Sequence, residues 1–438
     1  MNHIIMKQHI DIQMNNGLDS FGIQQKLSDQ YWSYFIPLFD EIFDELTHEN
    51  EVLSINKIEI DLGEILLEEI LKINEKPELL RKTKQQIIEQ ITKEISGTNT
   101  IVSSLPENHF HQWMFYMKNG YLNWNVASME DIVFQHVLEV LAMDGSKVEI
   151  FAHEVLKKSE FLSRLISQHS EDFLKDLLIM IAPDIKSQII NQIDSFKDFA
   201  ENQLLSESEK LNAIQSFYRE FIYNVVKLSS NGFDESIVFT LENLEAMSFE
   251  VKDYNSDTNE NILSDSQISE DDNPIYANNV GLVLVHPFIS TLFKNLELVQ
   301  NHEFVNKKAR EKAVYLLYYA VSGLQNPKEY ELVVPKILCG FPTHSVISNQ
   351  VFLSPNELSE IDDMLKGMIA NWEILNNTSI EGLRDGFLKR KGKINIQADR
   401  IKILVEKGSI DMLLDYLPWN LSHIELPWLK HIIQVEWR

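Results

Sequence analysis

Apolar and polar residues alternate strictly in two short stretches near the start of the chain, His9–Met14 and Ile58–Gly63. Such alternation is typical of a strand with one buried face. Between them, the apolar residues of Gln24–Leu46 recur every three or four positions, which is helical spacing. The opening therefore predicts a strand, a helix and a strand, followed by a helical stretch over Glu64–Ile95 that breaks near Pro77.

The middle of the chain repeats the helical pattern several times and contains few convincing strands. Helices are predicted over Asp131–Ala142, Val148–Ser167, Glu171–Ile181 and Lys210–Leu228. No internal repeat of solenoid length is present, and no sustained run of apolar heptads is flanked by charges. The pattern therefore predicts short packed helices rather than a long coiled-coil rod.

A change of composition separates this middle from the rest of the chain. Residues 248–279 are acidic, rich in Asn and Ser and poor in apolar residues, without a helical or strand period. We interpret them as a flexible linker. The expected organisation is an N-terminal module with its following helix, a helical middle, the linker and a C-terminal α+β domain rich in Trp and Pro: residues 1–96, 97–247, 248–279 and 280–438.

Core-forming patterns return after the linker. Ser354 is placed to cap a helix whose first position is Pro355. Gly392–Ile396 and Ile401–Glu406 alternate around a short turn, which predicts a β-hairpin. Helices are predicted over Phe288–Leu298, Arg310–Ser322 and Pro355–Leu375. We therefore expect a mainly α fold with small α+β modules at the N-terminal end and in the C-terminal half.

The charge and cysteine content narrow the choice of partner and compartment. Lys and Arg number 39 against 66 Asp and Glu, a formal net charge of -27, which disfavours nucleic acid as a partner and suits a cationic protein surface. A single cysteine, Cys339, excludes an internal disulfide framework and fits a reducing cytoplasm. Residues 1–13 lack the apolar core of a signal peptide, and no stretch approaches the length of a membrane helix. We expect neither Sec-type export nor a membrane span.

Residues that commonly carry catalysis do not form a recognisable motif. His109 and His111 lack a nearby ligand set, so a helix N-terminus is favoured over a metal site. Cys339 and His344 are the sharpest nucleophile and base pair, but the apolar run before the cysteine favours a buried thiol. Zinc-protease, Walker, dinucleotide-binding and nucleophile-elbow signatures are missing. We therefore expect no catalytic residue, cofactor or metal, and a protein that is not an enzyme.

Tryptophans are the most distinctive candidates for an interaction site, and three of them lie close together at the C-terminal end. Such rings bury large areas either in a core or at an interface, and the sequence leaves both open. The candidate interaction residues are Trp32, Trp113, Trp124, Trp372, Trp419, Trp428 and Trp437.

Several of these tryptophans belong to blocks whose order resembles a known family. The opening blocks His3–Ile10, Leu27–Trp32 and Ile55–Ile65 are similar to the N-terminal region of contractile injection system tape measure proteins. The middle segment Trp113–Trp124 resembles another block of that family, with Asn123 where Pro is usual. The C-terminal blocks that carry the resemblance are Gly281–Phe288, Leu338–Gly340, Asn371–Trp372, Thr378–Ser379, Glu381–Arg384, Phe387–Arg390, Leu417–Trp419 and Pro427–Trp428.

The resemblance implies a place in a bacterial, phage-tail-like assembly of baseplate, inner tube and contractile sheath. There the chain would set the length of tube and sheath by steric, non-catalytic means. The implied partners are inner tube, baseplate or hub proteins and further copies of the chain. The implied location is the cytoplasm during assembly and then the tube lumen. An assembly chaperone, or a baseplate or hub adaptor without length control, is the alternative.

Overall fold

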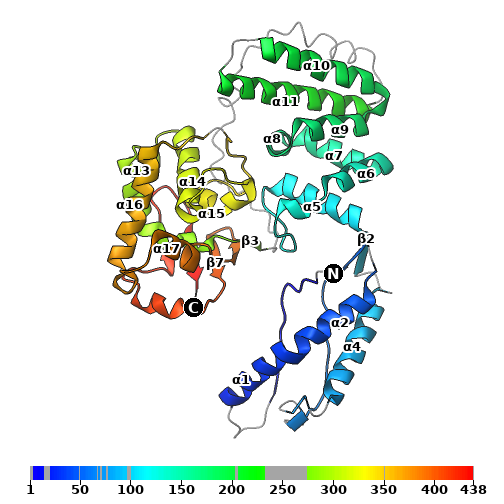
Figure 1. Cartoon of the computed structure of the whole chain (residues 1–438), viewed down its shortest axis with the longest axis vertical. Coiled ribbons are helices and arrows are strands. Elements are labelled where there is room, and N and C mark those ends of the chain that lie inside the picture. The colour runs from blue at the N-terminus through cyan, green and yellow to red at the C-terminus, as the bar shows by residue number, and fades with distance from the viewer. Residues whose placement is uncertain are drawn as a thin grey trace. The chain divides into compact units, whose positions relative to one another are not determined.

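The computed structural model describes ten parts of the chain, which are residues 3–13, 20–48, 50–66, 68–69, 72–74, 77–95, 100–202, 206–231, 274–349 and 351–437. The chain divides into two compact units (Figure 1). The first consists of Met1–His111 with Val133–Val137, and the second of Gln112–Ile132 with Leu138–Arg438. Each unit is described by itself.

Two antiparallel helical segments form the core of the first unit. The first is continuous and consists of α1 (Ser20–Gln30), a π-helical turn (Tyr31–Phe35) and α2 (Ile36–Leu46), and the second is α4 (Glu78–Ile95). Their buried contact residues are spaced three and four apart, as helical packing requires, and are Leu38, Ile42, Ile87 and Ile91. The predicted helix over Gln24–Leu46 is confirmed, as is a helix after Pro77.

The strands of the first unit differ from those predicted. Residues 9–13 and 58–63 form no strand, although Ile58 and Ile60 pack against the helical core. The observed ladder pairs β1 (Glu51–Ile55) with β2 (Thr100–Ser104) in antiparallel register. The prediction was wrong because alternation shows only that a segment suits a sheet, and the strand also needs a partner backbone. Met14, the last residue of the first predicted strand, lies outside the described residues.

Short helices follow one another through the middle of the chain. They are α5 (Leu105–Asn119), α6 (Phe134–Met143), α7 (Gly145–Lys157), α8 (Ser159–Gln168), α9 (Glu171–Ile181), α10 (Lys186–Asn202) and α11 (Glu207–Asn231). The single helix predicted over Val148–Ser167 is two, because Lys158 is extended and ends α7. The hydroxyl of Ser170 accepts a hydrogen bond from the Phe173 N–H and fixes the start of α9.

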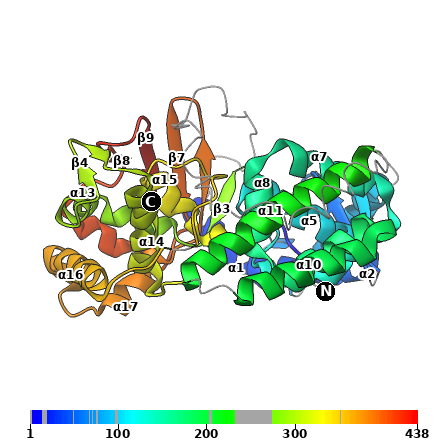
Figure 2. The same ribbon diagram turned by 90° about the horizontal axis from the view of Figure 1, so that it is seen from above.

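The C-terminal part combines helices with one five-stranded sheet. Its α-helices are α13 (His286–Asn295), α14 (Lys307–Ser322), α15 (Val333–Leu338), α16 (Pro355–Asn371) and α17 (Ile380–Leu383). The sheet has the order β3-β6-β7-β9-β8, with β7 and β9 parallel and the other pairs antiparallel. Its strands are β3 (Ile275–Ala277), β6 (Gly392–Ile396), β7 (Arg400–Val405), β8 (His423–Ile424) and β9 (Ile432–Glu436). In Figure 2, β7 and β9 lie above α14 and α16.

Short turns complete this part. A two-stranded ladder pairs β4 (Val299–Gln300) with β5 (Glu303–Phe304). The 3₁₀ turns are Val280–Val285, Glu329–Leu332, Glu373–Leu375 and Asp411–Tyr416, and Arg384–Leu388 is a π-helical turn. The predicted hairpin is confirmed, with Ile394 opposite Ile403. The predicted capping by Ser354 is also confirmed, since its hydroxyl accepts from the Glu357 N–H.

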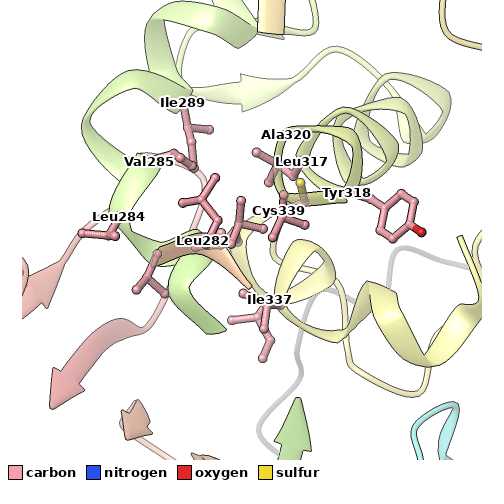
Figure 3. Close-up of a cluster of buried hydrophobic side chains, with 14 of the residues drawn as sticks. Leu282, Leu284, Val285, Ile289, Leu317, Tyr318, Ala320, Ile337 and Cys339 are labelled. Atoms are coloured by element: carbon pink, nitrogen blue, oxygen red, sulfur yellow. The ribbon is translucent and has the colours of Figure 1, made fainter. Parts of the chain in front are cut away.

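A buried apolar turn lies at the centre of the C-terminal core. All six residues of Val280–Val285 are buried, and Figure 3 shows Leu282 and Val285 facing α14 and the end of α15. Gly281 packs against the carbonyl oxygen of Phe387 so closely that a Cβ at this position would collide with the backbone. The GLVLV stretch is therefore a packing element.

The fold class expected from the sequence is confirmed: the described residues are mainly helical, with few short strands in small sheets. Residues 248–273 of the predicted linker lie outside the described residues, and its last residues, 274–279, include strand β3.

Candidate functional site

The seven candidate tryptophans fall into three groups by exposure. Trp113 and Trp372 are completely buried, and Trp437 is 4% exposed. Trp419 and Trp428 are partly buried and pack against the C-terminal core. Trp32 and Trp124 are 66% and 38% exposed. In this fold, therefore, Trp32 and Trp124 are the candidates most open to a partner.

The C-terminal tryptophans meet one another and nearby phenylalanines. The ring centroid of Trp372 lies 4.8 Å from that of Phe387 and 6.2 Å from that of Trp419. The Trp428 indole N–H donates to the Leu338 carbonyl at 2.8 Å. These contacts join the Leu-Pro-Trp and Pro-Trp blocks near the end of the chain to the helices before them.

Trp113 belongs to a second aromatic cluster, in the helical middle. Its ring contacts those of Phe151, Phe161 and Phe173, and its indole N–H donates to Nε2 of His169 at 2.9 Å. Nδ1 of His169 lies 3.0 Å from the Leu165 carbonyl oxygen, to which it donates. A proton on Nε2 would face the indole N–H, so this geometry requires a neutral imidazole. Burial lowers the pKa of His169 to about 4.

The lowered pKa predicts acid-sensitive stability. Above pH 6.5 the histidine is neutral in both folded and unfolded chains, and the stabilisation is complete; as the pH falls from 6.5 to about 4 it is lost. The loss is on the order of 3 kcal/mol. We expect His169→Gln, whose amide oxygen can accept the same bond without titrating, to have a flatter stability profile than the wild type. Urea unfolding followed by tryptophan fluorescence between pH 4 and 7 measures this, and parallel profiles would contradict it.

A buried ionic cluster connects the helical middle to the C-terminal part within the second unit. Arg164 on α8 and Lys336 on α15 are completely buried, and Glu329 is 4% exposed. The guanidinium of Arg164 donates to both carboxylate oxygens of Glu329 at 3.0 Å, and Nζ of Lys336 donates to Oε1 at 3.0 Å. One carboxylate thus serves two buried cations.

Backbone carbonyls accept further hydrogen bonds from both cations of this cluster. Arg164 also donates to the carbonyl oxygens of Met117 at 2.5 Å and His344 at 2.6 Å, and Lys336 donates to that of Thr343 at 3.3 Å. Burial lowers the pKa of Lys336, while Glu329 opposes that shift. No sequence motif marks these residues, since Arg164 and Glu329 are 165 positions apart.

Of the residues considered for catalysis, His344 contributes only its backbone carbonyl to this cluster. Cys339 is completely buried, and burial raises the pKa of its thiol, which disfavours the nucleophilic thiolate. His109 and His111 lie within α5, and Nδ1 of His109 is 2.9 Å from Nδ1 of His136. No group of three or more potential metal ligands is found among the described residues. Over the same residues, no helix is both long and apolar enough to cross a membrane.

Fold and site together define a mainly helical protein in which aromatic packing and buried ion pairs hold the elements of the second unit together. Its sequence matches the model of the family described as contractile injection system tape measure protein over residues 2–437. The chain therefore belongs to the contractile injection system tape measure protein family. No curated protein and no solved structure matches it. Membership in a family of structural components implies a non-enzymatic role in association with the tube of an injection system.

Proposed function

We propose that this chain sets the length of the inner tube and sheath of a contractile injection system by steric means. The observation that carries the proposal is the family match, which extends over nearly the whole chain. The strongly acidic composition supports it, because a net charge of -27 suits a cationic inner tube wall. The chain then assembles in the cytoplasm and lies in the tube lumen, with inner tube, baseplate or hub proteins as its partners.

A ruler requires an extended state, which the compact units do not provide. A wholly helical chain of 438 residues would span about 660 Å at 1.5 Å per residue. The longest α-helix among the described residues is α11, with 25 residues. We infer that the units are an assembly form that lengthens in the tube. Residues 1–96 and 280–438 are then the attachment ends, and the helical region 97–247 with the acidic linker 248–279 is the spacer between them.

Insertions in the predicted linker test this function without changing any described residue. An added helical segment of about 30 residues within 248–273 should lengthen the tube by about 45 Å, and a deletion should shorten it in proportion. A scrambled linker of unchanged length is the control. Electron microscopy of purified particles gives the tube lengths, and unchanged lengths across the insertion series would refute the ruler.

The compactness of the described parts favours one alternative, an assembly chaperone or a baseplate or hub adaptor without length control. Such a protein would bind tube or baseplate subunits in a fixed ratio and be missing from finished particles if it acts as a chaperone. Mass spectrometry of purified particles distinguishes the two. Loss of tubes after deletion of the chain, with unchanged length in the linker series, would favour this alternative.

A further inference from the structure

The N-terminal arm, residues 3–13, has the side-chain pattern of a strand but no strand partner. Among the described residues, no backbone hydrogen bond joins it to another segment. Its residues 4–13 are exposed, and the large apolar side chains of Ile10 and Ile12 are 61% and 42% exposed. The arm therefore exposes a row of apolar side chains, and its backbone pairs with no strand among the described residues.

The β1–β2 ladder of the same unit has no third strand among the described residues. It consists of two strands only, and such a ladder is marginally stable in water without a third strand or strong packing. Val102 of β2 lies opposite Leu53, which packs on the helical core, yet Val102 is 53% exposed. The apolar face of the ladder is therefore left exposed at Val102.

Among the described residues, no further strand pairs with the outer edge of β2. The Ser104 N–H points away from β1 and donates to Oε2 of Glu107 at 3.0 Å. Because alternate residues of an antiparallel strand direct their backbone groups to the same side, the N–H and C=O of Val102 also point to the outer edge. The β2 sequence, Thr-Ile-Val-Ser-Ser, has no charged residue or proline to obstruct pairing at that edge.

The arm of the same chain runs away from this edge. Nε2 of His3 lies 2.8 Å from Oδ1 of Asp44, near the end of α2, whereas the chain must reach the start of α1 at Ser20. These two points are roughly 36 Å apart along the continuous helix, and Figure 1 draws the arm along it toward α1. Residues 9–13 are thus carried away from β2 of their own unit.

We propose that residues 9–13 of one copy add as a third strand to the outer edge of β2 in a second copy, with the exchange made reciprocally. Ile10 and Ile12 then cover Val102 and extend the apolar face of the ladder. Strand addition satisfies the backbone of both segments, and a reciprocal exchange closes as a two-fold dimer. Residues 9–13 lose no burial by leaving their own helix, because they are exposed there. This pairing does not depend on the ruler role.

Sedimentation velocity of the full chain across the micromolar range tests the proposal. We expect a monomer–dimer equilibrium in the wild type and dimerisation weakened at least tenfold by Val102→Lys, because a charge would lie on the apolar face of the new strand pair. Met143→Lys is the matched control, since Met143 is 86% exposed in the second unit, and it should dimerise as the wild type does. A wild type that stays monomeric, or equal weakening in both variants, would overturn the proposal.

Disulfide trapping identifies the paired segments. Mixing an Ile12→Cys chain with a Val102→Cys chain under mild oxidation should give a cross-linked dimer in higher yield than either chain alone. The native Cys339 is completely buried and contributes little background. A bond that forms only within one chain carrying both substitutions would show that the arm pairs with its own ladder and would refute exchange.

Discussion

Glu329→Gln is expected to destabilise the second unit by about 3 to 5 kcal/mol. The substitution keeps the shape of the side chain but removes the single negative charge that faces Arg164 and Lys336, both completely buried. Two cations would then remain in the interior without a counter-charge. Urea unfolding at neutral pH, monitored by circular dichroism, measures the change in free energy.

Two further variants separate the charge effect from a general loss of packing. Glu331→Gln changes the same short helix at a half-buried carboxylate, which accepts from the Lys328 N–H at 2.7 Å and the Tyr318 hydroxyl at 3.2 Å. We expect it to cost about 1 kcal/mol. Adding Lys336→Met to Glu329→Gln removes one unpaired cation and should restore part of the stability. A Glu329→Gln loss no greater than that of Glu331→Gln would contradict the assigned importance of the cluster.

Features governed by local chemistry could be predicted from the sequence. Helix α9 follows from the helical spacing of its apolar residues, and the start of α16 from the serine cap at Ser354. The β6–β7 hairpin follows from two alternating runs joined by a short turn. In each case, the residues that form the pattern and the residues that they contact lie close together in the sequence. Contacts with distant parts of the chain therefore have little influence on whether the element forms.

Features that depend on distant partners could not be predicted. The alternation at 9–13 and 58–63 indicated strands, but the ladder formed between 51–55 and 100–104. The ionic cluster remained hidden because an arginine, a glutamate and a lysine far apart in sequence carry no shared spacing. Tryptophan content likewise did not distinguish Trp113, which is buried, from Trp32, which is exposed. The packing of whole helices decides which strands pair and which charged side chains come into contact.

Trp372→Ala is expected to destabilise the C-terminal part by about 3 to 5 kcal/mol, because it empties a completely buried ring volume at the end of α16. Trp372→Phe should cost less. The indole N–H of Trp372 has no hydrogen-bond partner among the described residues, so phenylalanine loses volume but no polar contact. Trp32→Ala is the control, and its 66% exposure predicts a change below about 1 kcal/mol.

The same series decides whether the Trp blocks of the C-terminal part serve the core or a partner. Trp372 touches Trp419, so the Asn-Trp block and the first Leu-Pro-Trp block form one packed cluster although 47 positions separate the two rings. If their main role is packing, Trp372→Ala and Trp419→Ala should lower stability and particle assembly together, and Trp372→Phe should preserve both. Assembly lost at full stability in Trp419→Ala would instead assign that ring to an interface. Unfolding curves and particle counts from the same variants measure both quantities.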